Sequence, residues 1–124
     1  MTHLELARKL CQMIGEGKLH EALDELYDEN VEVIEGNGDS FHGRETQKKR
    51  VTEWQESLQE MHDGGVYAIT ANEEDGVTIV ESWVDVTFKG APGPMKFEEV
   101  GVQTWKDGKI VRERFYYNTA AMQA

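Results

Sequence analysis

The first half of the chain carries its apolar residues at helical intervals. Positions three and four residues apart are apolar through residues 4–14, and Thr2 with Glu5 has the spacing of a capping box ahead of them. A second one-sided stripe covers residues 19–27. A third pattern runs through residues 44–62, and its apolar positions are Val51, Trp54, Leu58 and Met61. We therefore expect three helices in this half of the chain.

The second half changes to a period of two, which is typical of β-strands. Four apolar, β-branched runs are separated by glycine-containing turns, and they cover residues 66–72, 77–89, 95–106 and 109–118. The Asp107-Gly108 pair favours a two-residue hairpin, because both residues tolerate positive φ angles. A short strand is also expected at residues 31–35. Helices followed by an antiparallel meander indicate an α+β protein with the helices on one face of the sheet.

Length and composition narrow the class of protein. The 124 residues contain no linker, repeat or low-complexity segment, so one domain covering residues 1–124 is expected. A net charge of −11 disfavours nucleic acid and membrane partners. The single cysteine, Cys11, and an N-terminus without a signal-peptide pattern favour a cytoplasmic protein. The histidines lack metal-ligand spacing and nucleotide-binding motifs are missing, so we expect neither a metal nor a cofactor.

Three short motifs carry a resemblance to a known family. They are residues 26–31 (LYDENV), 41–45 (FHGRE) and 105–110 (WKDGKI). Their order and spacing, over nearly the whole chain, resemble the nuclear transport factor two superfamily in its SnoaL-like and ketosteroid-isomerase-like branch. The resemblance implies a cone, in which a curved, mainly antiparallel sheet wraps around three N-terminal helices. It also implies a small apolar ligand in a cavity of the cone and a homodimer formed through the outer sheet face.

Glu35 is the first candidate for chemistry. The resemblance implies that Glu35 stands where ketosteroid-isomerase-like members carry the carboxylate that moves a proton, with Val33 on the same face of the strand. An apolar pocket raises the pKa of a carboxyl group and makes it a stronger base. The alternative is a solvated acid at the end of a strand, beside Gly36. Both interpretations stay open on the sequence alone.

The hydrogen-bond donors of a steroid isomerase are missing. The resemblance implies a tyrosine in the first helix and a second acid on the third long strand. This chain has Leu10 or Cys11 at the first place and Gly101 at the second. A donor pair is needed to hold the developing enolate oxygen. The resemblance therefore disfavours that particular activity.

Replacement groups are expected on the inward faces of the last two strands. Glu99 and Gln103 share one face by alternation, with Gln103 as a hydrogen-bond donor and Glu99 as a second acid. Glu113 follows on the last strand. Glu35, Glu99 and Glu113 would then converge, and like charges at short range raise at least one pKa. We expect Glu35, Glu99 and Gln103 to be catalytic.

The other expected ligand contacts lie on inward strand faces or on the third helix. They are Tyr27, Val33, Trp54, Ser82, Val84, Gly101, Glu113, Phe115 and Tyr117. Simpler alternatives remain for several of them. Glu113, and less so Glu99, could pair with Arg112 or Arg114 or lie in water at the rim, and the tyrosines could be packing residues.

Three kinds of function fit these features. The first is a cofactor-independent isomerase or cyclase with Glu35 as the base, acting on a small apolar molecule. The second is a non-catalytic, dimeric module for ligand binding or protein interaction. Trp83, between Glu81 and Asp85 on the outward face of its strand, suits such a partner surface. The third, a transport-factor-like adaptor, has no specific motif in its favour.

Overall fold

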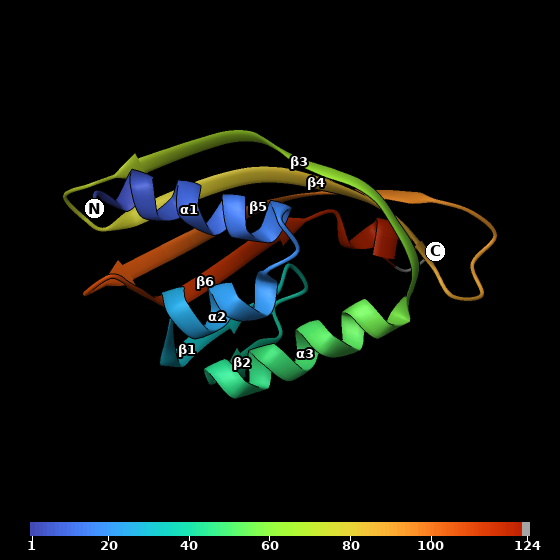
Figure 1. Ribbon diagram of the computed structural model, residues 1–124, viewed down its shortest axis with the longest axis horizontal. Coiled ribbons are helices and arrows are strands. Elements are labelled where there is room, and N and C mark those ends of the chain that lie inside the picture. Colours follow the sequence, from blue (N-terminus) through green and yellow to red (C-terminus); the bar gives the residue numbers. More distant parts are fainter. Residues whose placement is uncertain (123–124) are drawn as a thin grey trace.

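The computed structural model describes residues 1–122 as three helices packed on one face of a curved, open sheet (Figure 1). The elements are α1 (His3–Gly15), α2 (Leu19–Leu26), β1 (Tyr27–Ile34), β2 (Ser40–His42), α3 (Arg44–Ser57), β3 (Leu58–Asn72), β4 (Val77–Phe88), β5 (Met95–Lys106), β6 (Lys109–Tyr117) and a final 3-10 turn (Thr119–Met122). The strand order is β2-β1-β6-β5-β4-β3. All neighbours are antiparallel except β1 and β6. The expected α+β fold is confirmed.

The core lies between the helices and the sheet, and its residues come from α1, α2, β1, β5 and β6. Its buried members are Leu10, Ala22, Leu23, Leu26, Tyr27, Val31, Val33, Trp105 and Ile110. Burying one large apolar side chain contributes about 1.5–3 kcal/mol, so this cluster supplies a large share of the hydrophobic stabilisation. None of the helices in residues 1–122 combines the length and the apolar character needed to cross a membrane.

The third helix is shorter than its apolar spacing predicts. We expected a helix through residue 62, but α3 ends at Ser57 and β3 begins at Leu58, which pairs with Phe88 of β4. Val51 packs against the core, but Trp54 is 37% exposed and Met61 is 54% exposed, so the later part of the stripe does not face the core. Pairing along a long strand satisfies the backbone hydrogen bonds of this segment, and that pairing outweighs a weak helical pattern.

Two further strand boundaries differ from the expectation. β1 begins at Tyr27, because Tyr27 pairs with Ile110 of β6 and continues directly from α2. β3 runs through Gly64 and Gly65, a glycine pair whose position after the helical pattern of residues 44–62 predicts the end of the third helix. A Cβ on Gly65 would lie 2.8 Å from the indole nitrogen of Trp83, so the close approach of that ring requires glycine inside the strand. β2 has three residues, too few for a sequence period.

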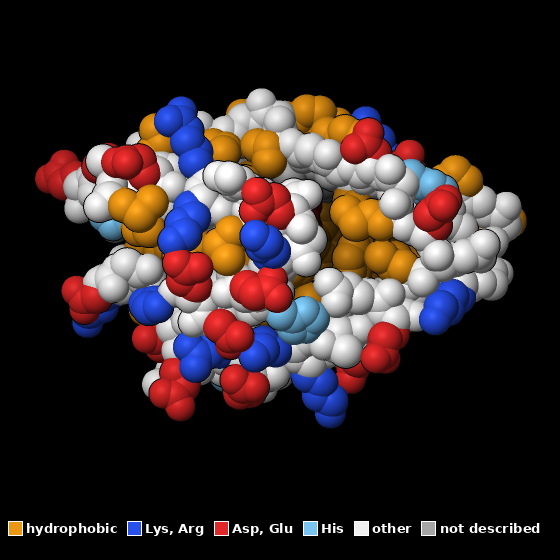
Figure 2. Space-filling model, viewed as in Figure 1, with side chains coloured by type: hydrophobic (Ala, Val, Ile, Leu, Met, Phe, Trp, Pro, Cys, Tyr) orange, Lys and Arg blue, Asp and Glu red, His pale blue; other side chains and the backbone are white. Residues whose placement is uncertain are grey.

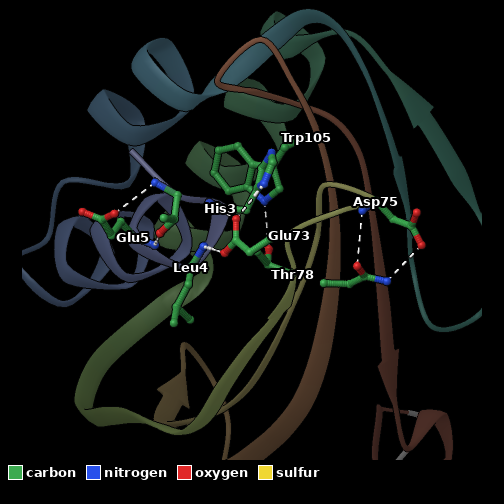
Figure 3. A network of polar contacts seen from close by, with 9 residues as sticks. His3, Leu4, Glu5, Glu73, Asp75, Thr78 and Trp105 are labelled. Carbon is green, nitrogen blue, oxygen red and sulfur yellow. Dashed lines mark hydrogen bonds and ion pairs between the residues drawn. The ribbon is translucent and has the colours of Figure 1, made fainter.

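The N-terminus of α1 is attached to the turn between β3 and β4 (Figure 3). The Glu73 carboxylate accepts hydrogen bonds from the backbone N–H groups of His3, at 2.7 Å, and Leu4, at 2.9 Å. The capping box of Thr2 and Glu5 is present as the sequence indicated. Together these contacts satisfy backbone donors that a helix N-terminus leaves free, and they hold α1 against one end of the sheet.

Candidate functional site

A hollow opens on the helical side of the sheet. Figure 2 shows it with hydrophobic side chains in its wall, between the end of α1, the helix α3 and the bend where β3 begins. Ser82, Glu99 and Tyr117 are cross-strand neighbours on β4, β5 and β6, and all three are half-buried. They alternate with outward-facing residues and so belong to the concave face. We call these three residues the open row.

A second set of cross-strand neighbours on the same face is buried. Thr78, Gln103 and Glu113 are 0%, 2% and 3% exposed, and Val33 of β1 pairs next to Glu113. We call Thr78, Gln103 and Glu113 the buried row. Along the strands, the residues of the concave face therefore change from half-buried to buried, and both rows contain polar side chains.

Hydrogen bonds join the buried row into a chain that ends on Glu113. The Trp105 indole N–H donates to Thr78 Oγ1 at 2.8 Å, a bond drawn in Figure 3, and the Thr78 hydroxyl donates to Gln103 Oε1 at 2.8 Å. Gln103 Nε2 donates to Glu113 Oε2 at 3.0 Å. The Tyr27 hydroxyl donates to Glu113 Oε1 at 2.6 Å. Each oxygen of the Glu113 carboxylate thus has a donor.

Burial controls the ionisation of this chain. It raises the pKa of Glu113 to about 7, although the hydrogen bonds from Tyr27 and Gln103 act in the opposite direction. Burial, and then the negative charge of Glu113, raise the pKa of Tyr27 well above its usual range. Tyr27 therefore stays a hydrogen-bond donor across the physiological pH range.

Glu99 in the open row is the second acid with a displaced titration. Its pKa is raised to about 7, first by burial and then by the negative charges of Glu113 and Glu35. The three acids are therefore close enough to influence one another. A carboxyl group that titrates near neutral pH can both release and accept a proton under ordinary conditions.

Glu35 is held by donors on both sides. Arg50 Nη2 lies 2.9 Å from Glu35 Oε1, and the Tyr117 hydroxyl donates to Oε2 at 3.1 Å. The guanidinium of Arg50 in turn stacks 3.6 Å from the centre of the Phe41 ring. The Glu35 side chain is 19% exposed. Glu35 is thus an oriented carboxylate, and the alternative of a solvated acid at a strand end does not describe it.

Arg112 and Arg114 were considered as partners of Glu113, but among the described residues Glu113 bonds to Tyr27 and Gln103 and to no arginine. Arg112 lies 3.3 Å from Glu32 instead, on the opposite face of the sheet. Of the other expected contacts, Val33 and Gly101 are buried, Val84 and Phe115 are half-buried on the concave face, and Trp54 is exposed on α3.

Two members of the site were not among the residues selected from the sequence. Arg50 belongs to a basic run, residues 48–50, whose position on the polar side of the third helix predicts a solvated, ion-paired face. Arg50 is ion-paired, but its partner is Glu35 and its side chain is only 26% exposed. Thr78 could have been found, since alternation puts it on the same face as Val80. In residues 1–122 no group of three His, Cys, Asp or Glu side chains is arranged to hold a metal ion.

Comparison with known proteins places the chain in a family. The family model of the SnoaL-like domain matches residues 1–117. A candidate SnoaL-like polyketide cyclase from Mesorhizobium loti is 29% identical, with a TM-score of 0.83 over 94% of this chain and 100% of that one. A candidate polyketide cyclase from Pseudomonas putida is 18% identical, with a TM-score of 0.80 over 98% of this chain and 96% of that one.

A candidate isomerase from Bacillus subtilis is 21% identical, with a TM-score of 0.71 over 96% of this chain and 88% of that one. At such identities the last two structures show a shared fold alone. No match is found among curated proteins. Because the family model spans nearly the whole chain, the protein belongs to the SnoaL-like domain family, within the superfamily that the sequence motifs resemble.

Proposed function

We propose that the protein binds a small, mostly apolar carbonyl compound in the hollow and catalyses cofactor-independent proton transfer, as an isomerase or cyclase does. The observation that most supports the proposal is a pair of unlike carboxyl groups, one in the open row and one hydrogen-bonded to Tyr117 of that row. Glu35 is oriented by Arg50 and Tyr117, and the pKa of Glu99 lies at about 7. Candidate cyclases and isomerases among the structural neighbours agree with this class of reaction.

The two acids would divide the work according to their surroundings. The Glu35 carboxylate removes a proton from the carbon next to the carbonyl group, so that a C–H bond breaks, the electron pair moves to the oxygen and Glu35 gains the proton. Glu99, about half protonated near pH 7, returns a proton to the product, and exchange with water then removes the proton from Glu35 and restores the one on Glu99. When two neighbouring acids lie in different environments, their pKa values differ, so one can act as the acid and the other as the base. No redox step or cofactor is needed.

Exchange of the α-protons of 2-tetralone in D2O, followed by proton NMR, tests the proposal. The wild-type protein is expected to accelerate the exchange, and Glu35→Gln is expected to lower the protein-catalysed rate by about a hundredfold or more, because the amide cannot accept the proton. Glu32→Gln is the matched control on β1, since Glu32 pairs with Arg112 away from the hollow. An undiminished rate in Glu35→Gln would remove Glu35 as the base. No acceleration by wild type would favour a non-catalytic ligand-binding module.

We also propose that the protein acts in the cytoplasm as a homodimer that uses the outer face of the sheet. Trp83 and Tyr67 stack there with ring centres 6.4 Å apart, and Lys96 Nζ lies 4.9 Å over the Trp83 ring. Ile79 is 40% exposed and Tyr116 is 50% exposed. Large apolar side chains gathered on one exposed face are typical of a protein interface.

Light scattering at micromolar concentration tests the dimer. Wild type is expected to have the mass of two chains, and Ile79→Glu the mass of one, because a buried unpaired charge opposes association. Ile14→Glu on α1 is the matched control, since Ile14 is 42% exposed on a helix rather than on the sheet face. A monomeric wild type would contradict the proposal, as would equal dissociation in both variants.

A further inference from the structure

We infer that the Gln103 side-chain amide is a fixed hydrogen-bond donor for a ligand carbonyl oxygen at the inner end of the hollow. Thr78 and Trp105 are positioning residues, since they determine which way the amide points without touching the ligand. The inference deepens the proposed function by assigning the group that recognises the oxygen of a ring ketone. It rests on that proposal for the location of the ligand.

The direction of the hydrogen-bond chain is set at its Trp105 end. An indole N–H can donate but cannot accept, so its bond to Thr78 Oγ1 uses the hydroxyl oxygen as acceptor. The single hydroxyl proton of Thr78 is then directed to its other partner, Gln103 Oε1. The carbonyl end of the Gln103 amide is thereby held toward β4, and its NH2 end is held toward β6.

Reversal of the amide would leave buried groups without partners. The Thr78 hydroxyl would receive two N–H donors and lose the acceptor of its own proton. Above pH 7, where Glu113 is ionised, the Gln103 oxygen would then face a carboxylate, which has no hydrogen to donate. An unsatisfied buried polar group destabilises the folded protein, and the whole row is at most 3% exposed. The orientation seen in the structure is therefore strongly favoured.

One hydrogen of the amide nitrogen is free for a ligand. Nε2 carries two hydrogens, and within residues 1–122 the Glu113 carboxylate is its one acceptor. Gly101 explains where the nitrogen lies, because a Cβ on Gly101 would be 2.9 Å from Nε2. The missing side chain leaves room over Gly101 for the amide and for the ring of Phe115, whose Cε1 would lie 3.2 Å from the same Cβ. On this face of β5, Gly101 separates Gln103 from Glu99 of the open row. A neutral acceptor such as a ketone oxygen fits this donor better than a carboxylate, because Glu113 and Glu99 would repel a second negative charge.

Binding of a ketone and its matching hydrocarbon tests the inference without requiring turnover. Dissociation constants for 2-tetralone and tetralin, measured by NMR titration, are expected to favour the ketone about tenfold in wild type, since one hydrogen bond separates them. Thr78→Val should abolish the preference while leaving tetralin affinity unchanged, and Thr78→Ser should restore it. The side-chain NH2 signal of Gln103 is expected to shift with the ketone only. If Thr78→Val does not fold, Gln103→Met carries the same expectation.

Equal wild-type affinities for the two compounds, absence of binding of either, or a full ketone preference in Thr78→Val or Gln103→Met would overturn the inference. Deuterium exchange on the same wild-type samples reports on the proposed function separately. A ketone preference without exchange retains the Gln103 donor and contradicts proton transfer. Exchange without a ketone preference supports proton transfer and contradicts the Gln103 donor.

Discussion

The variant Glu99→Gln is expected to be more stable than wild type at pH 8 by about 3 kcal/mol and equally stable at pH 4. Burial and neighbouring charge raise the pKa of Glu99 from 4.5 to about 7. Between these values the folded protein holds a proton that the unfolded chain releases, so the free energy of unfolding falls as the pH rises. Above pH 7 the loss is complete, and a neutral glutamine avoids it. One pKa unit corresponds to about 1.4 kcal/mol.

Urea denaturation at pH 4, 6 and 8 measures this effect. Glu98→Gln is the matched control, because Glu98 is the preceding residue of β5, is exposed and accepts from Tyr67 on the outer face. We expect that control to change stability by less than about 0.5 kcal/mol at every pH. A Glu99→Gln variant less stable than wild type at pH 8 would show that the Glu99 carboxylate makes favourable contacts that outweigh its burial.

The variant Tyr27→Phe is expected to lose about 2 kcal/mol of stability at pH 8. The hydroxyl of Tyr27 donates to Glu113 Oε1 at 2.6 Å, and Glu113 is 3% exposed. A hydrogen bond to a buried charged group contributes about 1.5–3 kcal/mol. Removing this donor also raises the pKa of Glu113 further, since the bond favours the charged form. The loss should therefore be smaller at pH 4, where Glu113 is neutral in both proteins.

Tyr67→Phe is the control for this substitution. The Tyr67 hydroxyl also donates to a glutamate, Glu98, but Tyr67 is 47% exposed, so water can replace this hydrogen bond. We expect a change below about 0.5 kcal/mol in urea denaturation at either pH. Equal losses in the two tyrosine variants, or a larger loss for Tyr27→Phe at pH 4 than at pH 8, would contradict the role of the Glu113 carboxylate.

Local periodicity was sufficient for the faces of the last strands but not for the boundaries of β1 and β3 or for the contacts between elements. Alternation along β5 and β6 predicted correctly that Gln103 and Glu113 face inward, and the same rule puts Arg112 and Arg114 on the other face. Alternation therefore already argued against an arginine partner for Glu113. The sequence neighbours of an acid on a strand are poor guides to its partners.

Long-range contacts account for what the sequence did not predict. Arg50 meets Glu35 because α3 packs beside β1, and no spacing rule relates a residue on a helix to the end of an earlier strand. The early end of α3 depends likewise on pairing between β3 and β4. Such tertiary contacts override local propensity, which is a weak determinant of where a helix ends.

The parallel pairing of β1 with β6 has a consequence for how the protein folds. Val33 and Glu113 are partners in this pair, although most of the chain lies between them. The hairpins of β3 to β6 can form from nearby residues, whereas this pairing must close a very long loop, and its entropy cost makes it slow. Glu35 meets Glu99 and Glu113 only after that closure. A partly folded chain with intact hairpins would thus lack the acid cluster altogether, and recovery of the cluster during refolding would report the last step of assembly.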